Sequence, residues 1–252
     1  MITAARRQLV PRPADPVTVI VGLVGPAEVH DLARAALRAV PGLLSAEFFT
    51  RAGLDVLAEH TGLVPPLRDP VPAFLLLEAA GPDAAEDLAG LAGDYPVAVA
   101  TTAADRARLW AYRERHPEAA GFLGVPLKLD VSVPAADWVT LATRVGEVVR
   151  AVDPDARLIS YGHVADGNLH VNLVPAAEAD GRHEDAVFGF VASLGGSISA
   201  EHGIGALKAR WLPLIRSAPE RALYARIRAA FDPAGILNPH VLPREGSPGQ
   251  GI

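Results

Sequence analysis

The chain has 252 residues, of which 50% are hydrophobic and 21% are charged, and its formal net charge is −6. This composition predicts a globular protein with a buried core, and an acidic balance without a basic run argues against nucleic acid as a partner. Cysteine is absent, which excludes disulfides, thiolate metal sites, iron–sulfur clusters and cysteine nucleophiles.

The first half of the chain alternates apolar runs with segments of helical periodicity. Residues 1–16 are polar and proline-rich and read as an edge strand or linker. The alternation predicts an α+β fold of ferredoxin type, an antiparallel sheet with helices on one face; a parallel doubly wound sheet is the competing topology. No Gly-rich phosphate loop joins a strand to a helix. The expected strands are 17–23, 44–50, 72–79 and 96–101, and the expected helices are 27–40, 51–60, 83–92 and 104–116.

The second half continues with a strand, an amphipathic helix and a hairpin, followed by helices. No apolar run is long enough to span a bilayer, and the N-terminus does not resemble a secretory leader, so we expect a cytoplasmic location and no transmembrane segment. The expected elements are a strand at 128–134, a helix at 135–152, the hairpin 157–174, and helices at 183–194, 206–216 and 219–231.

The hairpin carries two histidines. Asp166-Gly167 favours a two-residue type I′ turn, which would place His163 directly opposite His170. Opposed imidazoles about 5 Å apart at Cβ can converge on one metal ion. The alternative is that both rings are solvated on the outer face. Because side chains alternate, one face would carry Tyr161, His163, His170 and Asn172, and the core face would carry Val164, Leu169 and Val171.

A glycine-rich segment, 195–205, contains Glu201 and His202. Glu201 could supply an oxygen ligand beside the two imidazoles, and such a set leaves metal positions open for a substrate. His202 could act as a general base near neutral pH. The alternative is a glycine-rich connector with a surface carboxylate and a helix-capping histidine.

Four segments together resemble the C-terminal domain of FAD-linked oxidases, a superfamily that includes D-lactate dehydrogenases, the flavin subunit of glycolate oxidase and D-2-hydroxyglutarate dehydrogenase. The resemblance covers nearly the whole chain and implies an antiparallel sheet with helices that caps a separate FAD-binding domain. The segments are GHVADGNLHVN (162–172), SISAEHGIGALK (197–208), LWAYRER (109–115) with KLDVSVP (128–134), and DPAGILNP (232–239).

The resemblance implies a role for each matching residue. His163, His170 and Glu201 resemble the ligands of a divalent metal, for which zinc, manganese or iron are candidates, and His202 resembles the catalytic base. The residues that resemble substrate contacts are Arg113, Lys128 and Asn172, and Asn238 resembles a residue that lies near FAD.

The resemblance also implies a domain organisation. Residues 1–16 resemble the end of an FAD domain and its linker, 17–215 the substrate- and metal-binding cap domain, and 216–243 a helical segment that packs on an FAD domain. Residues 244–252 read as a disordered tail. The 252 residues contain no counterpart of the FAD-binding domain, so we expect such a domain or subunit as a partner and an inactive isolated chain.

The implied reaction is oxidation of a small 2-hydroxy acid to the 2-oxo acid, with hydride passed to FAD. Pro117 stands where the hydroxyglutarate enzymes have a substrate-contacting threonine, which argues against hydroxyglutarate as the substrate. The resemblance implies a 2-hydroxy acid such as D-lactate or glycolate. A second hypothesis is a non-catalytic metal-binding module that docks a flavoprotein through an exposed apolar face near Trp110, Trp211 and Ile236. A third is a metal-dependent hydrolase in which His202 activates water.

Overall fold

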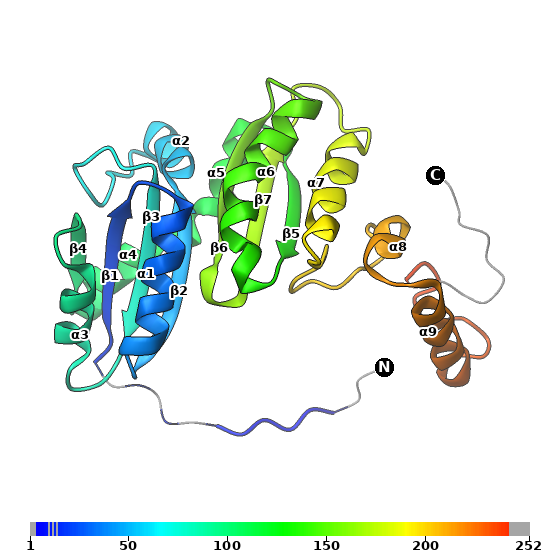
Figure 1. Cartoon of the computed structure of the whole chain (residues 1–252), viewed down its shortest axis with the longest axis horizontal. Helices are drawn as coiled ribbons and strands as arrows, with labels where there is room; N and C mark the ends of the chain where they lie inside the picture. Colours follow the sequence, from blue (N-terminus) through cyan, green and yellow to red (C-terminus); the bar gives the residue numbers. More distant parts are fainter. Residues whose placement is uncertain (1–3, 10, 12, 14, 242–252) are drawn as a thin grey trace.

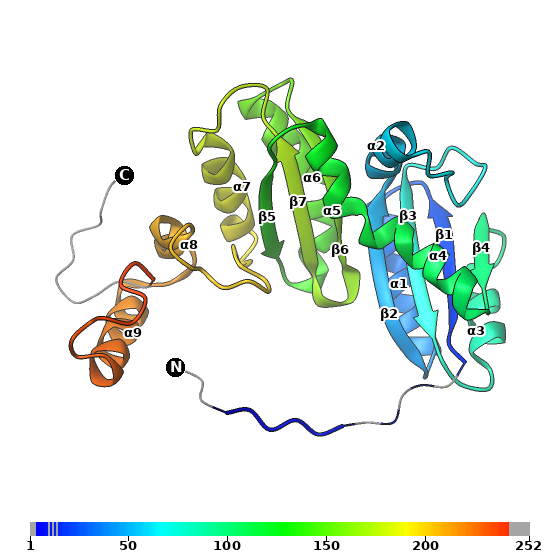
Figure 2. The ribbon, with the colours of Figure 1, turned by 180° about the vertical axis from the view of Figure 1, so that it is seen from behind.

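The computed structural model describes residues 4–9, 11, 13 and 15–241. Its centre is a seven-stranded sheet in the order β4-β1-β3-β2-β6-β7-β5, and all neighbouring strands run antiparallel (Figures 1 and 2). The α+β class is therefore confirmed, and the parallel doubly wound alternative is wrong. The strands are β1 (Val17–Leu23), β2 (Leu43–Thr50), β3 (Ala73–Ala79), β4 (Val97–Ala100), β5 (Leu127–Ser132), β6 (Arg157–His163) and β7 (Asn168–Val174).

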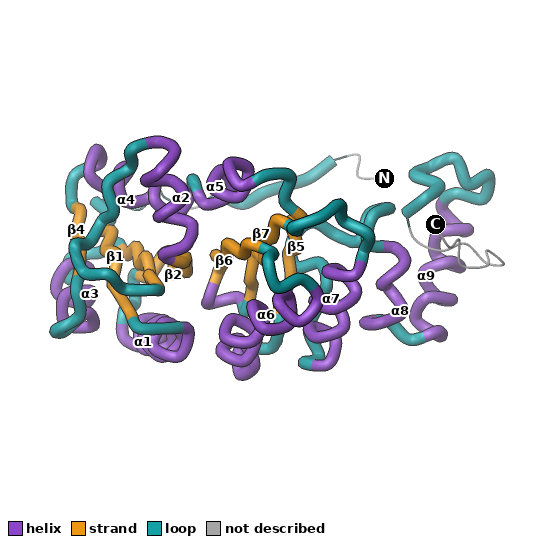
Figure 3. Tube along the Cα trace, turned by 90° about the horizontal axis from the view of Figure 1, so that it is seen from above, coloured by secondary structure: helices purple, strands orange, loops and turns teal. Residues whose placement is uncertain are grey.

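Helices cover both faces of the sheet (Figure 3). Val19 and Val21 of β1 pack into one core cluster with α1, α3, α6 and α7, while Ile20 packs on the other side with α2, α4 and α5. The sequence predicted helices on one face of the sheet, and the structure instead has helices on both faces. The helices are α1 (Pro26–Ala39), α2 (Arg51–Thr61), α3 (Ala84–Ala92), α4 (Ala103–Glu114), α5 (His116–Leu123), α6 (Trp138–Val152), α7 (Arg182–Ser193), α8 (Leu212–Ile215) and α9 (Ala218–Phe231), with short 3-10 turns η1 (Ala135–Asp137), η2 (Val164–Asp166) and η3 (Ala209–Trp211).

Two predicted helices are divided in the structure. The segment expected as one helix at 104–116 ends at Glu114, and α5 begins at His116 with Pro117 in its first turn. Proline lacks the N–H that would continue the earlier hydrogen-bond ladder, so it begins a new helix instead. The expected helix at 206–216 is likewise only η3 followed by the short α8, in which a proline again occupies the first turn.

The predicted register of the hairpin is wrong by two residues. Tyr161, and not His163, lies opposite His170. His163 instead pairs with Glu47 of β2, and η2 followed by left-handed Gly167 (φ 68°) closes a longer turn. A shift of two residues preserves the side-chain alternation. The predicted core face is therefore confirmed: Val164, Leu169 and Val171 are all buried in the first core cluster.

The sheet consists of two sections that meet where β2 pairs with β6. Only a short ladder joins them, with the residue pairs Glu47–His163, Phe48–Gly162 and Phe49–Tyr161. Gly162 is needed here because a Cβ at this position would lie 2.5 Å from the carbonyl oxygen of Asn168 in β7. The junction therefore brings the polar end of the hairpin against the N-terminal section.

The chain ends of the described part lie away from this junction. Figures 1 and 2 show α8 and α9 beyond the β5 edge of the sheet. Among the described residues, no helix combines the length and the apolar character needed to cross a membrane. The tail expected to be disordered, 244–252, lies outside the described residues.

Candidate metal and substrate site

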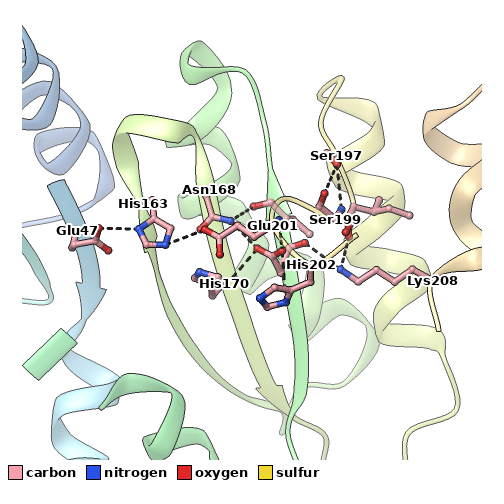
Figure 4. Close-up of polar contacts among 12 residues, drawn as sticks. Glu47, His163, Asn168, His170, Ser197, Ser199, Glu201, His202 and Lys208 are labelled. Atoms are coloured by element: carbon pink, nitrogen blue, oxygen red, sulfur yellow. Dashed lines mark hydrogen bonds and ion pairs between the residues drawn. The ribbon is translucent and has the colours of Figure 1, made fainter. Parts of the chain in front are cut away.

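The two hairpin histidines lie on the same face near the sheet junction (Figure 4). The ring centroids of His163 and His170 are 5.6 Å apart with an edge-to-face arrangement. Tyr161, opposite His170, stacks on its ring at 4.9 Å. The side chain of His170 is 14% exposed and that of His163 is 31% exposed, so both rings are positioned by strands and remain accessible from one side.

Glu201 completes a three-ligand cluster. One potential ligand atom from each of His163, His170 and Glu201 lies within 4.8 Å of the other two. The Nε2 atom of His163 is 3.1 Å from a carboxylate oxygen of Glu201. The structure therefore brings together the three residues expected as metal ligands, although 31 residues separate His170 from Glu201.

Glu47 on β2 holds the other side of the His163 ring. The Nδ1 of His163 donates a 2.8 Å hydrogen bond to Glu47 Oε1. Burial raises the pKa of Glu47, but this hydrogen bond and the charge of Arg113 outweigh it, so the pKa lies below its usual value. The same hydrogen bond raises the pKa of His163, against the opposing effect of burial. The hydrogen bond at the sheet junction therefore favours the ionised form of Glu47 and the protonated form of His163.

Arg113 on α4 reaches the same carboxylate from behind. Its Nη2 is 3.0 Å from Glu47 Oε2, and both side chains are almost fully buried. The guanidinium also lies over the ring of Tyr161, 4.5 Å from the centroid. Its Nε is buried without a hydrogen-bond partner among the described residues. Arg113 is thus held beside the cluster and retains an unpaired donor.

Asp130 on β5 anchors the loop that carries Glu201. Its Oδ2 accepts a 2.8 Å hydrogen bond from the backbone N–H of Glu201, and its Oδ1 accepts one of 2.8 Å from Asn168 Nδ2. Burial raises the pKa of Asp130, but these hydrogen bonds outweigh it and leave the pKa below its usual value. His170 Nδ1 lies 3.5 Å from the same carboxylate. Asp130 therefore connects β5, the hairpin and the ligand loop.

Lys208 closes the far end of the same loop. Its Nζ donates to the carbonyl of Ile198 at 2.7 Å and to that of Asp130 at 3.3 Å. Burial lowers the pKa of Lys208, and the charge of Asp130 partly offsets this. Ser132 and Ser197 form a β-bridge at the near end. These contacts fix a loop that has no helix or strand of its own.

The remaining predicted residues near the site lie outside the cluster of His163, His170 and Glu201. His202 is 70% exposed, with Nδ1 3.9 Å from Asp130 Oδ2. Lys128 on β5 is exposed and pairs across the ladder with Asn172 on β7. Asn172 is buried, and its Nδ2 has no hydrogen-bond partner among the described residues. Buried unpaired donors are costly, so those of Asn172 and Arg113 are suited to a bound ligand.

Asn238 is not brought into this cluster. It follows α9, is exposed and adopts a left-handed backbone (φ 42°). Its carbonyl accepts a hydrogen bond of 2.6 Å from Arg228 of α9. Figures 1 and 2 both show α9 well away from the hairpin, so any contact of Asn238 with a cofactor is separate from the metal ligands.

Sequence reasoning missed Glu47, Asp130 and Lys208. Each had a visible signal: Glu47 and Asp130 are single carboxylates within apolar strands, where an ionised group needs a partner. Lys208 ends the SISAEHGIGALK segment. The sequence did not indicate which residue each of them contacts. Glu47 and His163, for example, are 116 residues apart.

Several known proteins and one protein family are similar in sequence to the chain. The sequence model described as "FAD linked oxidases, C-terminal domain" matches residues 12–242. The mitochondrial D-2-hydroxyglutarate dehydrogenase of Rattus norvegicus is 32% identical over 258 residues, which covers 95% of this chain and 47% of the relative. The D-2-hydroxyglutarate dehydrogenase of Xanthomonas citri pv. viticola is 33% identical and covers 81% of this chain and 47% of the relative.

A solved structure shows a similar arrangement. The 4-ethylphenol oxidase from Gulosibacter chungangensis, in an isoeugenol complex, matches with a TM-score of 0.63 and 15% identity, over 94% of this chain and 56% of that chain. At this identity the likeness concerns the fold alone. The chain spans about half the length of the curated relatives it matches.

Proposed function

Because the chain belongs to the family of FAD-linked oxidase C-terminal domains, we propose that it is the substrate- and metal-binding part of an FAD-dependent 2-hydroxyacid dehydrogenase. The observation that carries the proposal is the cluster of His163, His170 and Glu201, whose ligand atoms lie within 4.8 Å of one another. The relatives named as D-2-hydroxyglutarate dehydrogenases act on a 2-hydroxy acid, which supports the same reaction class.

The donor set fits a divalent metal ion. Two imidazole nitrogens and one carboxylate oxygen suit zinc, manganese or iron, and they leave positions for a substrate. His163, His170 and Glu201 would hold the ion. When bound, it would act as a Lewis acid toward the substrate's hydroxyl and carboxylate oxygens.

The chain's own residues would bind the acid and move one proton. His202 is exposed and has Asp130 on its Nδ1 side, so its Nε2 is the atom that would take the proton of the substrate's hydroxyl. Arg113 would use its unpaired Nε–H for a carboxylate, and Lys128 would add a point charge at the ladder's exposed edge. The amide of Asn172 would donate to a substrate oxygen.

The flavin requires residues beyond those of this site. FAD in the complete enzyme would accept the hydride. The sequence has no Gly-rich fingerprint for a dinucleotide, and Asn238 lies apart from the cluster, so we propose that FAD is held by an FAD-binding domain or subunit. Asn238 would contribute an edge contact to this flavin.

The apolar face of α9 fits a docking role for such a partner. Leu223, Ile227 and Phe231, spaced four residues apart, are 50%, 49% and 85% exposed, and Ile236 is 77% exposed. In contrast, Trp110 and Trp211 are half-buried and pack against the core clusters. The same face supports a second candidate function, a non-catalytic metal-binding subunit of a separate flavoprotein.

The choice of substrate is open to direct measurement. The relatives favour D-2-hydroxyglutarate, whereas Pro117, in the first turn of α5, argues against it and leaves D-lactate and glycolate as candidates. A dicarboxylate needs a second cation, and Lys128 and Arg113 together could supply the pair. A thermal-shift assay of the Zn²⁺-loaded chain with each acid should therefore rank the three substrates.

The metal proposal is tested on the full 252-residue chain. We expect isothermal titration with Zn²⁺ or Mn²⁺ to give one ion per chain, and His170→Ala to weaken the affinity at least about 100-fold while retaining the fold. We also expect the chain alone to be colourless and inactive with D-lactate. Equal binding by the variant, or turnover by a yellow isolated chain, would contradict the proposal.

A further inference from the structure

Glu47 lies in the sheet section opposite the hairpin, yet its carboxylate forms a hydrogen bond with the imidazole of His163, a proposed metal ligand. Its Oε1 accepts the Nδ1–H of His163 at 2.8 Å, and the two residues are direct partners in the β2–β6 ladder. The pairing of the two strands therefore fixes this contact, which does not depend on the position of a flexible surface side chain.

The carboxylate of Glu47 is itself fixed by further contacts besides the one with His163 that Figure 4 shows. Ser45 Oγ donates to Oε1 at 2.9 Å, and Arg113 Nη2 lies 3.0 Å from Oε2. The residue is 6% exposed. With both oxygens occupied, the group has little freedom to rotate, and it can impose an orientation on the imidazole that it binds.

The orientation determines which nitrogen of His163 is free. With Nδ1 occupied by Glu47, Nε2 is the remaining ligand atom, and it points at Glu201 at 3.1 Å. Histidine ligands commonly donate their second N–H to a carboxylate, which fixes the tautomer and the plane of the ring. His170 has a looser counterpart, since its Nδ1 lies 3.5 Å from Asp130.

We propose that Glu47 is a positioning residue that orients His163 for a divalent metal ion through the Nδ1 hydrogen bond, and links this ligand to Arg113. The inference rests on the proposed function, because it concerns the same metal site. It assigns to β2, a strand without a metal ligand of its own, a part in metal binding. It also explains why an ionised carboxylate is kept at the buried sheet junction.

The rival explanation is that Glu47 only neutralises the buried Arg113 and stabilises the junction. Glu78 provides a matched control. It is a partly buried carboxylate on the neighbouring β3 that accepts hydrogen bonds from Thr18 at 2.6 Å and Trp110 at 2.8 Å. Within the described part of the chain, Glu78 makes no hydrogen bond or ion pair with a histidine, so its removal should perturb the sheet without reorienting His163.

The experiment titrates Co²⁺ into the full chain and into Glu47→Ala, Glu47→Gln and Glu78→Ala, with circular dichroism as the folding check. The visible d–d spectrum of Co²⁺ reports the geometry of the ligands as well as the affinity. We expect Glu47→Ala to bind about 10- to 100-fold more weakly with an altered spectrum. Glu47→Gln should recover part of the affinity, because its amide oxygen can still accept the Nδ1–H, and Glu78→Ala should match the wild type.

Each outcome decides the question. A folded Glu47→Ala with the affinity and spectrum of the wild type, or a Glu78→Ala that is equally weakened, overturns the role of Glu47. If Glu47→Ala does not fold, Glu47→Gln decides: a several-fold loss supports the role and an unchanged affinity rejects it. A wild-type chain that binds no divalent ion refutes the proposed metal site, and the inference with it.

Discussion

His163 and His170 stand on paired strands, whereas Glu201 and His202 lie on a loop without a helix or strand of its own. The strand side is fixed by ladder register and by the buried Glu47, and its rings are 31% and 14% exposed. On the loop side, Glu201 and His202 are 46% and 70% exposed. The proposed ligands on the strands are therefore preformed, whereas the more exposed side chains on the loop have more freedom to move.

The difference between the two sides also has an energetic meaning. Strand pairing distributes the cost of holding a ligand over many backbone hydrogen bonds, whereas the loop depends on a few contacts with Asp130 and Lys208. Local stability varies across a structure in the same way. Three predictions test this contrast, beginning with the largest expected change in stability.

The strand side should become unstable on mild acidification because of His116, which is fully buried behind β2. Burial lowers the pKa of His116 from 6.5 to about 4, although backbone carbonyls of Thr50 and Tyr112 favour the charged form. The unfolded chain takes up the proton first. The contribution of the neutral, buried His116 to the free energy of unfolding is therefore complete above pH 6.5 and is lost as the pH falls toward 4. The loss amounts to about 3 kcal/mol.

This loss can be isolated by comparison with His116→Phe. Urea unfolding at pH 7 and pH 4 should show that the stability difference between the wild type and the variant shifts by about 3 kcal/mol against the wild type. The variant lacks the titrating group, so other carboxylates and histidines affect both proteins alike. A difference that stays constant with pH would show that the two carbonyls keep the pKa of His116 near its ordinary value.

The loop side should respond to Asp130→Asn. The amide cannot accept from both the Glu201 N–H and Asn168 without leaving a buried donor unpaired, and we expect a loss of about 1–3 kcal/mol in unfolding free energy. Because Glu201 is then less firmly placed, limited proteolysis near residues 199–205 should accelerate. Asp155→Asn, at an exposed site, is the control. Unchanged proteolysis would mean that Lys208 and the Ser132–Ser197 bridge fix the loop without Asp130.

His202→Ala should change the least in stability. The side chain is 70% exposed and its nearest carboxylate is 3.9 Å away, so we expect a change within about 0.5 kcal/mol in unfolding free energy. Metal affinity should also remain, because His202 is outside the three-ligand cluster. The effect should appear as lost turnover in the complete enzyme. A large fall in metal affinity would instead indicate that His202 is a ligand, and it would contradict the assignment of only Glu201 on the loop to the metal.

The cytoplasmic location and the roles of the individual site residues stay predictions. Relatives in Rattus norvegicus and Bos taurus are named as mitochondrial, so location has to be measured for this protein. The domain boundaries at 16 and 215 also stay predictions. Residue 215 does coincide with the end of α8, and the following helix α9 lies still farther from the sheet than α8 (Figure 1).

The sequence by itself determined the strands and the faces of the hairpin. Alternation with a period of two placed Tyr161, His163, His170 and Asn172 on one face of the hairpin, and an error of two residues in register left that face intact. Such patterns are local, since they depend on residues within about ten positions of one another. The three proposed ligands could be predicted for the same reason, because each of them lies in its own short motif.

Only the tertiary structure decided what surrounds those ligands. The pairing of β2 with β6 brings Glu47 and Arg113 to His163, and the β5 edge brings Asp130 to the loop of Glu201. No local pattern specifies which strands become neighbours, because that choice depends on burying two apolar faces of the whole sheet at once. The sequence therefore predicted a metal site, and the order of the strands brings Glu47, Arg113 and Asp130 next to its proposed ligands.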